Sequence, residues 1–325
     1  MSRPLWSVMI PSYNCSQYLI GTLRSVLQQD PGEELMQIEV VDDCSTDTDV
    51  EALVAYIGRG RVKYFRQSEN VGSLRNFETC LNRATGHYIH LLHGDDMARP
   101  GFYDEIAQLF TSFPEAGAAF TGYTYINELN TELSANRKLL SEPGILKNWL
   151  MEIGHTQHVQ PPAMVVKRSV YEKLGGFYAV HYGEDWEMWV RIAANYPVAH
   201  SPKRLAYYRV HENNITSRYF LTGQSVKDAM TVINIIQQYL PASERRRMHR
   251  IARRGFARYF AGMSDKIYHE YGQPYTALQQ AHRVLKMYAN PRTLYYFVKI
   301  YIKVLIGYKI EREKKPLFRP LNLFR

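Results

Sequence analysis

The sequence is poor in cysteine and has no N-terminal segment that resembles a secretion signal. Its 325 residues include three cysteines, Cys15, Cys44 and Cys80, whose spacing fits neither a zinc site nor a disulfide framework. We therefore expect free thiols in a reducing compartment. The first residues run directly into an apolar strand pattern, without the apolar core of a signal peptide. These absences predict a cytoplasmic protein.

A long membrane-spanning run is also missing. Residues 294–308 are apolar and aromatic but include Lys299 and Lys303, and a span needs about 20 apolar residues. Such a segment suits the membrane–water interface, with its lysines reaching anionic headgroups. The alternative is that its apolar face packs on the rest of the protein or on a second subunit.

Positive charge is scarce in the first part of the chain and concentrated in the last part. Residues 1–200 carry 16 Lys+Arg against 24 Asp+Glu, whereas residues 201–325 carry 24 against 7. Residues 243–258 predict a strongly cationic helix, and residues 309–325 add positive charge. A basic region of this kind could meet nucleic acid, anionic lipid or a phosphorylated substrate. Because no nucleic-acid motif accompanies it, we expect no nucleic-acid partner.

Strand and helix patterns alternate over roughly the first 120 residues. The pattern predicts strands at 6–11, 36–41, 62–65 and 88–92 and helices at 18–29, 49–57 and 74–84. This order is typical of a doubly wound, mostly parallel α/β sheet. A further strand is expected at 118–126 and helices at 145–153 and 184–194, and strand signals end near residue 219. We expect one domain over residues 1–218 and a basic helical region over residues 219–325.

Two acidic pairs directly follow predicted strands. Asp42 and Asp43 come after the strand 36–41, and Asp95 and Asp96 come after the strand 88–92. The carboxyl ends of neighbouring parallel strands face one crevice, where such sheets bind ligands. The first pair could accept hydrogen bonds from a pyrimidine N–H or from ribose hydroxyls, or form a turn and helix cap. The second pair is costly without compensation and is a candidate Mn²⁺ or Mg²⁺ site.

Other residues carry weaker signals, each with a structural alternative. Tyr13 could stack on a base or pack in the core, and Arg75 could reach a diphosphate or lie on the surface. Glu184 and Asp185 open a predicted helix, where acids act as caps, but an acid there also suits general-base catalysis. His211 could contact a metal or a diphosphate, or be structural.

Together these motifs resemble the inverting, nucleotide-sugar-dependent glycosyltransferases of family 2, which have the GT-A fold. The resemblance covers residues 5 to about 217. It rests on the ordered segments Ser7–Asn14, Val41–Asp47, Asn70–Gly72, Arg75–Asn76, Asp95–Asp96, Glu184–Trp186 and Arg209–Asn214. Each motif is weak alone, but their order and spacing together are specific.

The resemblance implies a Rossmann-like GT-A catalytic domain followed by an α-helical C-terminal region. It implies nucleotide-sugar contacts from Pro11, Tyr13, Asn14, Asp42, Asp43, Asn70, Arg75 and Asp95. It also implies Mn²⁺ or Mg²⁺ held by Asp95, Asp96 and His211. Asp185 matches the catalytic base, and Glu184 matches its neighbour in the acceptor site.

The expected reaction moves a sugar, most simply from a UDP-sugar, to a glycan or polyprenyl-diphosphate-linked acceptor at the inner face of the cell membrane. A dTDP-rhamnose donor stays open, as does a homo-oligomeric state. The chain lacks the Gln-x-x-Arg-Trp signature of processive synthases, which favours single additions.

One position departs from the family pattern. Family members often carry an acid two positions before Asp95, where this chain has His93, which leaves the primary metal ligand open between Asp95 and Asp96. Two rival functions are a nucleotidyltransferase and a catalytically silent scaffold. The first would show a Gly-rich phosphate loop in place of Pro11-Ser-Tyr-Asn14.

Overall fold

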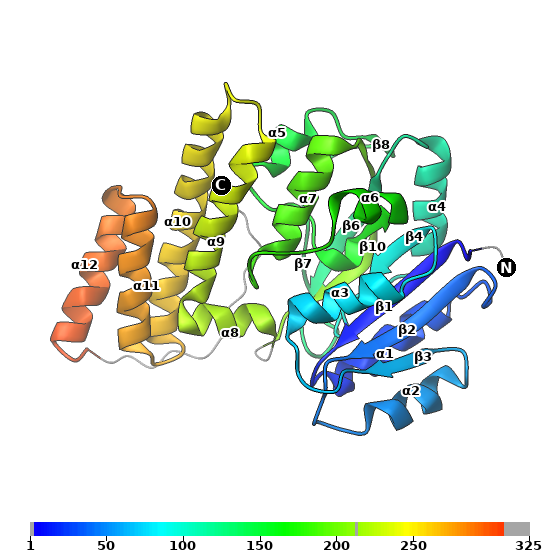
Figure 1. Cartoon of the computed structure of the whole chain (residues 1–325). Helices are drawn as coiled ribbons and strands as arrows, with labels where there is room; N and C mark the ends of the chain where they lie inside the picture. The colour runs from blue at the N-terminus through cyan, green and yellow to red at the C-terminus, as the bar shows by residue number, and fades with distance from the viewer. Residues whose placement is uncertain (1–2, 212–213, 309–325) are drawn as a thin grey trace. The chain divides into compact units, whose positions relative to one another are not determined.

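In the computed structural model, which describes residues 3–211 and 214–308, ten strands join into one sheet (Figure 1). The strands are β1 (Trp6–Ser12), β2 (Met36–Asp42), β3 (Lys63–Arg66), β4 (Tyr88–Leu91), β5 (Met97–Ala98), β6 (Ala118–Ile126), β7 (Glu132–Ala135), β8 (Gly144–Ile145), β9 (Met164–Lys167) and β10 (Val198–Arg209). Their order is β3-β2-β1-β4-β9-β6-β10-β5, with β7 paired to β6 and β8 to β10.

The first four strands form the predicted parallel sheet. β3, β2, β1 and β4 are parallel neighbours, and every residue of β1 and β2 is buried. Continuous burial fits the largely apolar sequence of β1, whereas β2 also buries Gln37 and Glu39, which are hydrogen-bonded to each other. β9 is antiparallel to both β4 and β6, whereas β10 is parallel to β6. The sheet is therefore mixed but mostly parallel, as predicted.

Helices flank this sheet on both faces. They are α1 (Ser16–Leu27), α2 (Val50–Gly58), α3 (Ser73–Arg83), α4 (Phe102–Ser112) and α6 (Arg168–Leu174). α1 and α2 lie on one face and α3 on the other (Figure 1), which is the doubly wound arrangement. The predicted helix over 145–153 is partly wrong. Gly144–Ile145 forms β8, and Asn148, with φ 53°, turns the chain before the short helix α5 (Trp149–Ile153).

The chain divides into two compact units. The first contains residues 1–149, 159–178 and 191–209, including the whole sheet, and the second contains residues 150–158, 179–190 and 210–325. Helix α7 (Glu184–Asn195) begins in the second unit and ends in the first. The expected functional boundary at residue 218 stays a prediction.

The second unit is helical, as predicted for the C-terminal region. It contains α8 (Ile215–Thr222), α9 (Gln224–Ile235), α10 (Arg245–His269), α11 (Pro274–Met287) and α12 (Pro291–Leu305). α11 and α12 both begin at prolines, and Asn290 caps α12 with its side chain. Prolines suit the first turn of a helix, which explains their place at these two helix starts.

Helix α12 turns its lysines toward the protein. Lys299 Nζ lies 2.7 Å from Asp265 Oδ1, and Lys303 Nζ lies 2.6 Å from His269 Nε2. The expectation that these lysines point outward to headgroups is wrong, because acidic and imidazole partners on α10 hold them. Among the described residues, no helix is long and apolar enough to cross a membrane. The positive charge expected of residues 309–325, and residues 212–213 of the last motif, lie outside the described residues.

Candidate active site

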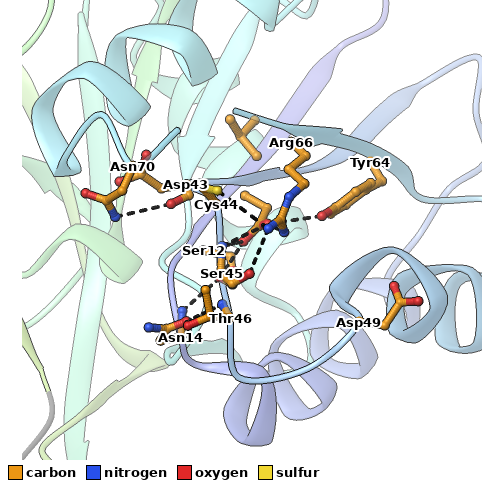
Figure 2. Close-up of polar contacts among 12 residues, drawn as sticks. Ser12, Asn14, Asp43, Cys44, Ser45, Thr46, Asp49, Tyr64, Arg66 and Asn70 are labelled. Carbon is orange, nitrogen blue, oxygen red and sulfur yellow. Dashed lines mark hydrogen bonds and ion pairs between the residues drawn. The ribbon is translucent and has the colours of Figure 1, made fainter. Parts of the chain in front are cut away.

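Asp42 ends β2 as a fully buried carboxylate with both oxygens engaged. Its Oδ2 accepts hydrogen bonds from Arg66 Nη1 at 2.6 Å and from the Tyr64 hydroxyl at 3.0 Å. Its Oδ1 accepts one from Ser45 Oγ at 2.5 Å. Figure 2 shows the side chains of Arg66, Tyr64 and Ser45 lying close to one another. Asp42 therefore holds the loop after β2 in place through protein contacts.

Asp43 joins this loop to the turn before α3. Its carboxylate accepts hydrogen bonds from Val71 N at 2.7 Å and Gly72 N at 3.0 Å. Asn70 Nδ2 donates to the Asp43 carbonyl at 3.2 Å (Figure 2). Burial raises the pKa of Asp43, and the two backbone N–H donors offset part of that rise. Two of the predicted segments are thus brought together, while Arg75 on α3 is exposed.

The loop after β1 lies against the same segment. Asn14 adopts a left-handed conformation, with φ 47°, which asparagine tolerates better than most residues. Its Oδ1 accepts a hydrogen bond from Thr46 N at 2.7 Å, and its N–H donates to Ser45 Oγ at 2.9 Å (Figure 2). Tyr13 beside it is 41% exposed. The exposed ring disfavours the alternative of a core-packing role for Tyr13.

Hydrogen bonds to neighbouring segments hold the turn that carries Asp95 and Asp96. Gly94 N donates to the Pro11 carbonyl at 3.0 Å, and Thr22 Oγ1 lies 2.7 Å from the Asp96 carbonyl oxygen. A Cβ on Gly94 would lie 2.9 Å from Cys15 Sγ and 3.2 Å from the Pro11 oxygen. Glycine at position 94 lets this turn approach the loop after β1.

Arg209, at the end of β10, is hydrogen-bonded to the same turn. Its backbone N donates to Asp96 Oδ1 at 2.8 Å, and its Nε donates to the Asp95 carbonyl at 2.8 Å. Its Nη1 donates to the Asn127 carbonyl at 2.8 Å. The sequence marked Arg209 as part of a motif but gave it no role. The structure shows that it fixes the acidic turn.

His93, Asp95 and Asp96 form a cluster that could hold a cation. Each offers one ligand atom, and these atoms lie within 4.8 Å of one another. Asp96 is 1% exposed, and its Oδ2 has no hydrogen-bond partner among the described residues. Burial, and then the charge of Asp95, raise the pKa of Asp96 well above its usual value. Two adjacent carboxylates with an unpaired buried oxygen fit a divalent cation.

Asp185 and Glu184 belong to the second unit, at the start of α7. Asp185 is 7% exposed, and its Oδ2 accepts a hydrogen bond from Gln157 Nε2 at 2.5 Å. Burial raises the pKa of Asp185 to about 7. Burial, and then the charge of Asp185, raise the pKa of Glu184 well above its usual value. A carboxyl group with a pKa near 7 is suited to accept a proton at neutral pH.

His211 is buried and also belongs to the second unit. Its role as a metal ligand stays a prediction. Sequence reasoning missed Arg66, Tyr64 and Gln157. Arg66 could have been found, because it is the residue opposite Asp42 in the β2–β3 register. Gln157 lies in an irregular segment and gives no sequence signal.

Comparison with known proteins gives consistent matches. The model of glycosyl transferase family 2 matches residues 7–175, more than half of the chain. An uncharacterized protein of Mycobacterium tuberculosis is 28% identical over 267 residues, which cover 75% of this chain and 80% of that protein.

Two solved structures have a similar fold. The crystal structure of S. aureus TarS 1–349 in complex with UDP-GlcNAc has a TM-score of 0.68 at 16% identity, over 93% of this chain and 92% of that chain. The mannosyltransferase PcManGT of Pyrobaculum calidifontis, in complex with GDP-Man and Mn²⁺, has a TM-score of 0.54 at 17% identity, over 94% and 81%. At these identities the likeness concerns the fold.

Proposed function

Since this chain belongs to glycosyl transferase family 2, we propose that it moves a sugar from a UDP-sugar to a hydroxyl of a glycan or lipid-linked glycan. The observation that carries the proposal is the acidic turn of Asp95 and Asp96, which is hydrogen-bonded to the end of β1 at the carboxyl ends of parallel strands. Nucleotides bind at this edge of α/β sheets. The UDP-GlcNAc bound to TarS supports UDP as the nucleotide.

We propose that the nucleotide is held by the residues around Asp43. Its carboxylate accepts two backbone hydrogen bonds and keeps lone pairs for a uracil N–H. The exposed Tyr13 ring is suited to stack on the base. Pro11, Asn14, Asn70, Arg75 and Asp95 complete the proposed contacts, while Asp42 serves by holding the loop.

We propose that Asp95 and Asp96, with His211, hold Mn²⁺ or Mg²⁺. Asp96 Oδ2, which has no hydrogen-bond partner among the residues that the structure describes, and the neighbouring Asp95 supply the oxygen ligands that these ions prefer. A bound divalent ion would offset the negative charge that develops on the departing diphosphate.

The proposed reaction is a single displacement at the anomeric carbon. Asp185 takes the proton of the acceptor hydroxyl while the hydroxyl oxygen forms the new bond to that carbon. The bond from the carbon to the diphosphate oxygen breaks, and the anomeric configuration inverts. Glu184 contributes to the acceptor site, and Gln157 orients Asp185 through the hydrogen bond to Oδ2.

Asp185→Asn tests this mechanism. We expect transfer to fall by about 10²–10⁴-fold, because the amide cannot accept the proton, as measured by nucleoside diphosphate release with a panel of donor sugars. Asp104→Asn is the matched control, since Asp104 is an exposed acid in the first turn of α4. Near-wild-type transfer by a folded Asp185→Asn protein would contradict the mechanism. No turnover of any UDP- or dTDP-sugar by the wild type would favour the scaffold function.

We further propose that α12 docks on the inner face of the cell membrane. Its outward residues are apolar and recur at helical spacing: Leu294, Val298, Tyr301, Ile302 and Leu305 are all exposed. Arg246, Arg250, Arg254 and Arg258 form an exposed i, i+4 row on α10. An apolar helix face together with a basic region matches an anionic lipid surface.

Flotation with phosphatidylglycerol vesicles tests the docking surface. We expect Ile302→Glu/Leu305→Glu to release the protein, because charge on this face opposes burial in the headgroup region. Leu129→Glu is the control, since Leu129 is an 83% exposed apolar residue of the first unit. Unchanged flotation of the double variant would overturn the proposal. A smaller particle mass without a change in flotation would assign the face to a second copy of the chain.

A further inference from the structure

His93 is the member of the acidic turn that the proposed function leaves without a role. The imidazole stacks on Phe77, with ring centroids 5.1 Å apart and an interplanar angle of 19°. Its Nε2 is buried and has no hydrogen-bond partner among the described residues. A buried polar atom without a partner destabilises the folded protein and calls for an explanation.

The surroundings of His93 point to a cation. Its ligand atom lies within 4.8 Å of those of Asp95 and Asp96. The Asp96 Oδ2 is likewise buried and unpaired among the described residues, while Arg209 N holds Oδ1 at 2.8 Å. One nitrogen and one oxygen without partners therefore occur in the same cluster. A single bound ion would satisfy both.

The turn is built so that these groups keep their places. The residue between His93 and Asp95 is Gly94, whose N–H is bonded to the Pro11 carbonyl. Phe77 packs on the imidazole plane, and Arg209 Nε is bonded to the Asp95 carbonyl. A ligand fixed in advance by stacking and backbone contacts loses little freedom on binding, which favours coordination.

We propose that His93 is a metal ligand and makes this site prefer Mn²⁺ and similar transition-metal ions over Mg²⁺. This inference rests on the proposed metal site of Asp95 and Asp96. Imidazole nitrogen suits first-row transition metals, whereas Mg²⁺ selects oxygen ligands. A carboxylate at position 93 would replace this nitrogen ligand with oxygen, so the site would discriminate less between the two ions.

Calorimetric titration of the metal-free full chain with MnCl₂ and with MgCl₂ tests the selectivity. We expect the ratio of Mn²⁺ to Mg²⁺ affinity to fall by about tenfold or more in His93→Asp. His87→Asp is the matched control, because His87 is an exposed histidine six positions earlier. An unchanged affinity ratio in a folded His93→Asp protein would overturn the inference.

Pulsed electron paramagnetic resonance of bound Mn²⁺ gives a readout independent of activity. We expect the ¹⁴N coupling of the wild type to lose the His93 contribution in His93→Ala and to stay unchanged in His87→Ala. A ¹⁴N coupling that is the same in wild type and His93→Ala, with Mn²⁺ binding lost in Asp95→Asn, would overturn the role of His93 and leave the proposed metal site standing. Wild-type protein that binds no Mn²⁺ would overturn both, whereas the transfer assay tests the proposed reaction separately.

Discussion

At the scale of single residues, adjacent acidic residues have different surroundings, and they therefore differ in their capacity to accept hydrogen bonds from a ligand. The Asp42 carboxylate accepts hydrogen bonds from Arg66, Tyr64 and Ser45. Within the described part of the chain, the Asp43 carboxylate accepts hydrogen bonds from main-chain donors of the turn before α3. The first is therefore a structural anchor, and the second retains acceptor capacity for a ligand. The sequence placed both acids at the end of a strand. It could not separate their roles, because that depends on partners 20 or more positions away.

The raised pKa of Asp185 predicts a pH-dependent rate. A base with a pKa of about 7 is protonated at lower pH, so transfer should fall as pH decreases through 7. The Gln157 hydrogen bond stabilises the ionised form. Gln157→Leu should therefore move the midpoint of the pH–rate profile to higher pH. A midpoint that stays in place, or moves to lower pH, would contradict this account of the base.

The raised pKa of Asp185 also makes the stability of the folded protein depend on pH. Folding raises the pKa of Asp185 from 3.8 to about 7. The stability that the Asp185 carboxyl group contributes is therefore present below pH 4 and is lost as pH rises through 7. Asp185→Asn should therefore gain stability over the wild type between pH 5 and pH 8, as measured by urea unfolding at both pH values. A stability difference independent of pH would show that Asp185 does not ionise in this range.

At the scale of elements, the strand ends were predictable and the helix faces were not. Largely apolar segments located β1, β2 and β4, and the acids that follow β2 and β4 fell at the expected edge. Lys299 and Lys303 were assigned to the wrong side of α12, because their partners Asp265 and His269 lie on another helix. The antiparallel insertion of β9 also has no local signal, since it is set by pairing with β4 and β6.

Two glycines in different elements give opposite predictions. Gly94→Ala should destabilise the protein by about 1–3 kcal/mol, because the new Cβ would crowd Cys15 Sγ and the Pro11 oxygen. Gly262→Ala, inside α10 with nothing within 4 Å of the new Cβ, should stabilise it by up to about 1 kcal/mol. Urea unfolding measures both changes. Equal effects of the two substitutions would contradict the close approach described at Gly94.

At the scale of the whole molecule, the charge difference read from the sequence separates two sets of residues. The acidic part, residues 1–200, supplies the sheet and the candidate donor site. The basic part, residues 201–325, supplies most of the helices of the second unit. The chain passes more than once between the two units, which a reading of composition along the sequence does not reveal. Membership of glycosyl transferase family 2 fits the predicted fold and enzyme class.

The central claim is that the acidic turn of the first unit binds the diphosphate of a nucleotide sugar through a divalent ion. The most direct measurement is the thermal stability of the protein with UDP-, dTDP- and GDP-sugars, in Mn²⁺ and in chelator, for wild type, Asp95→Asn and the control Asp104→Asn. We predict stabilisation by a UDP-sugar that requires the metal, persists in Asp104→Asn and is lost in Asp95→Asn. Stabilisation that survives both the chelator and Asp95→Asn, or no response to any donor, would contradict the claim.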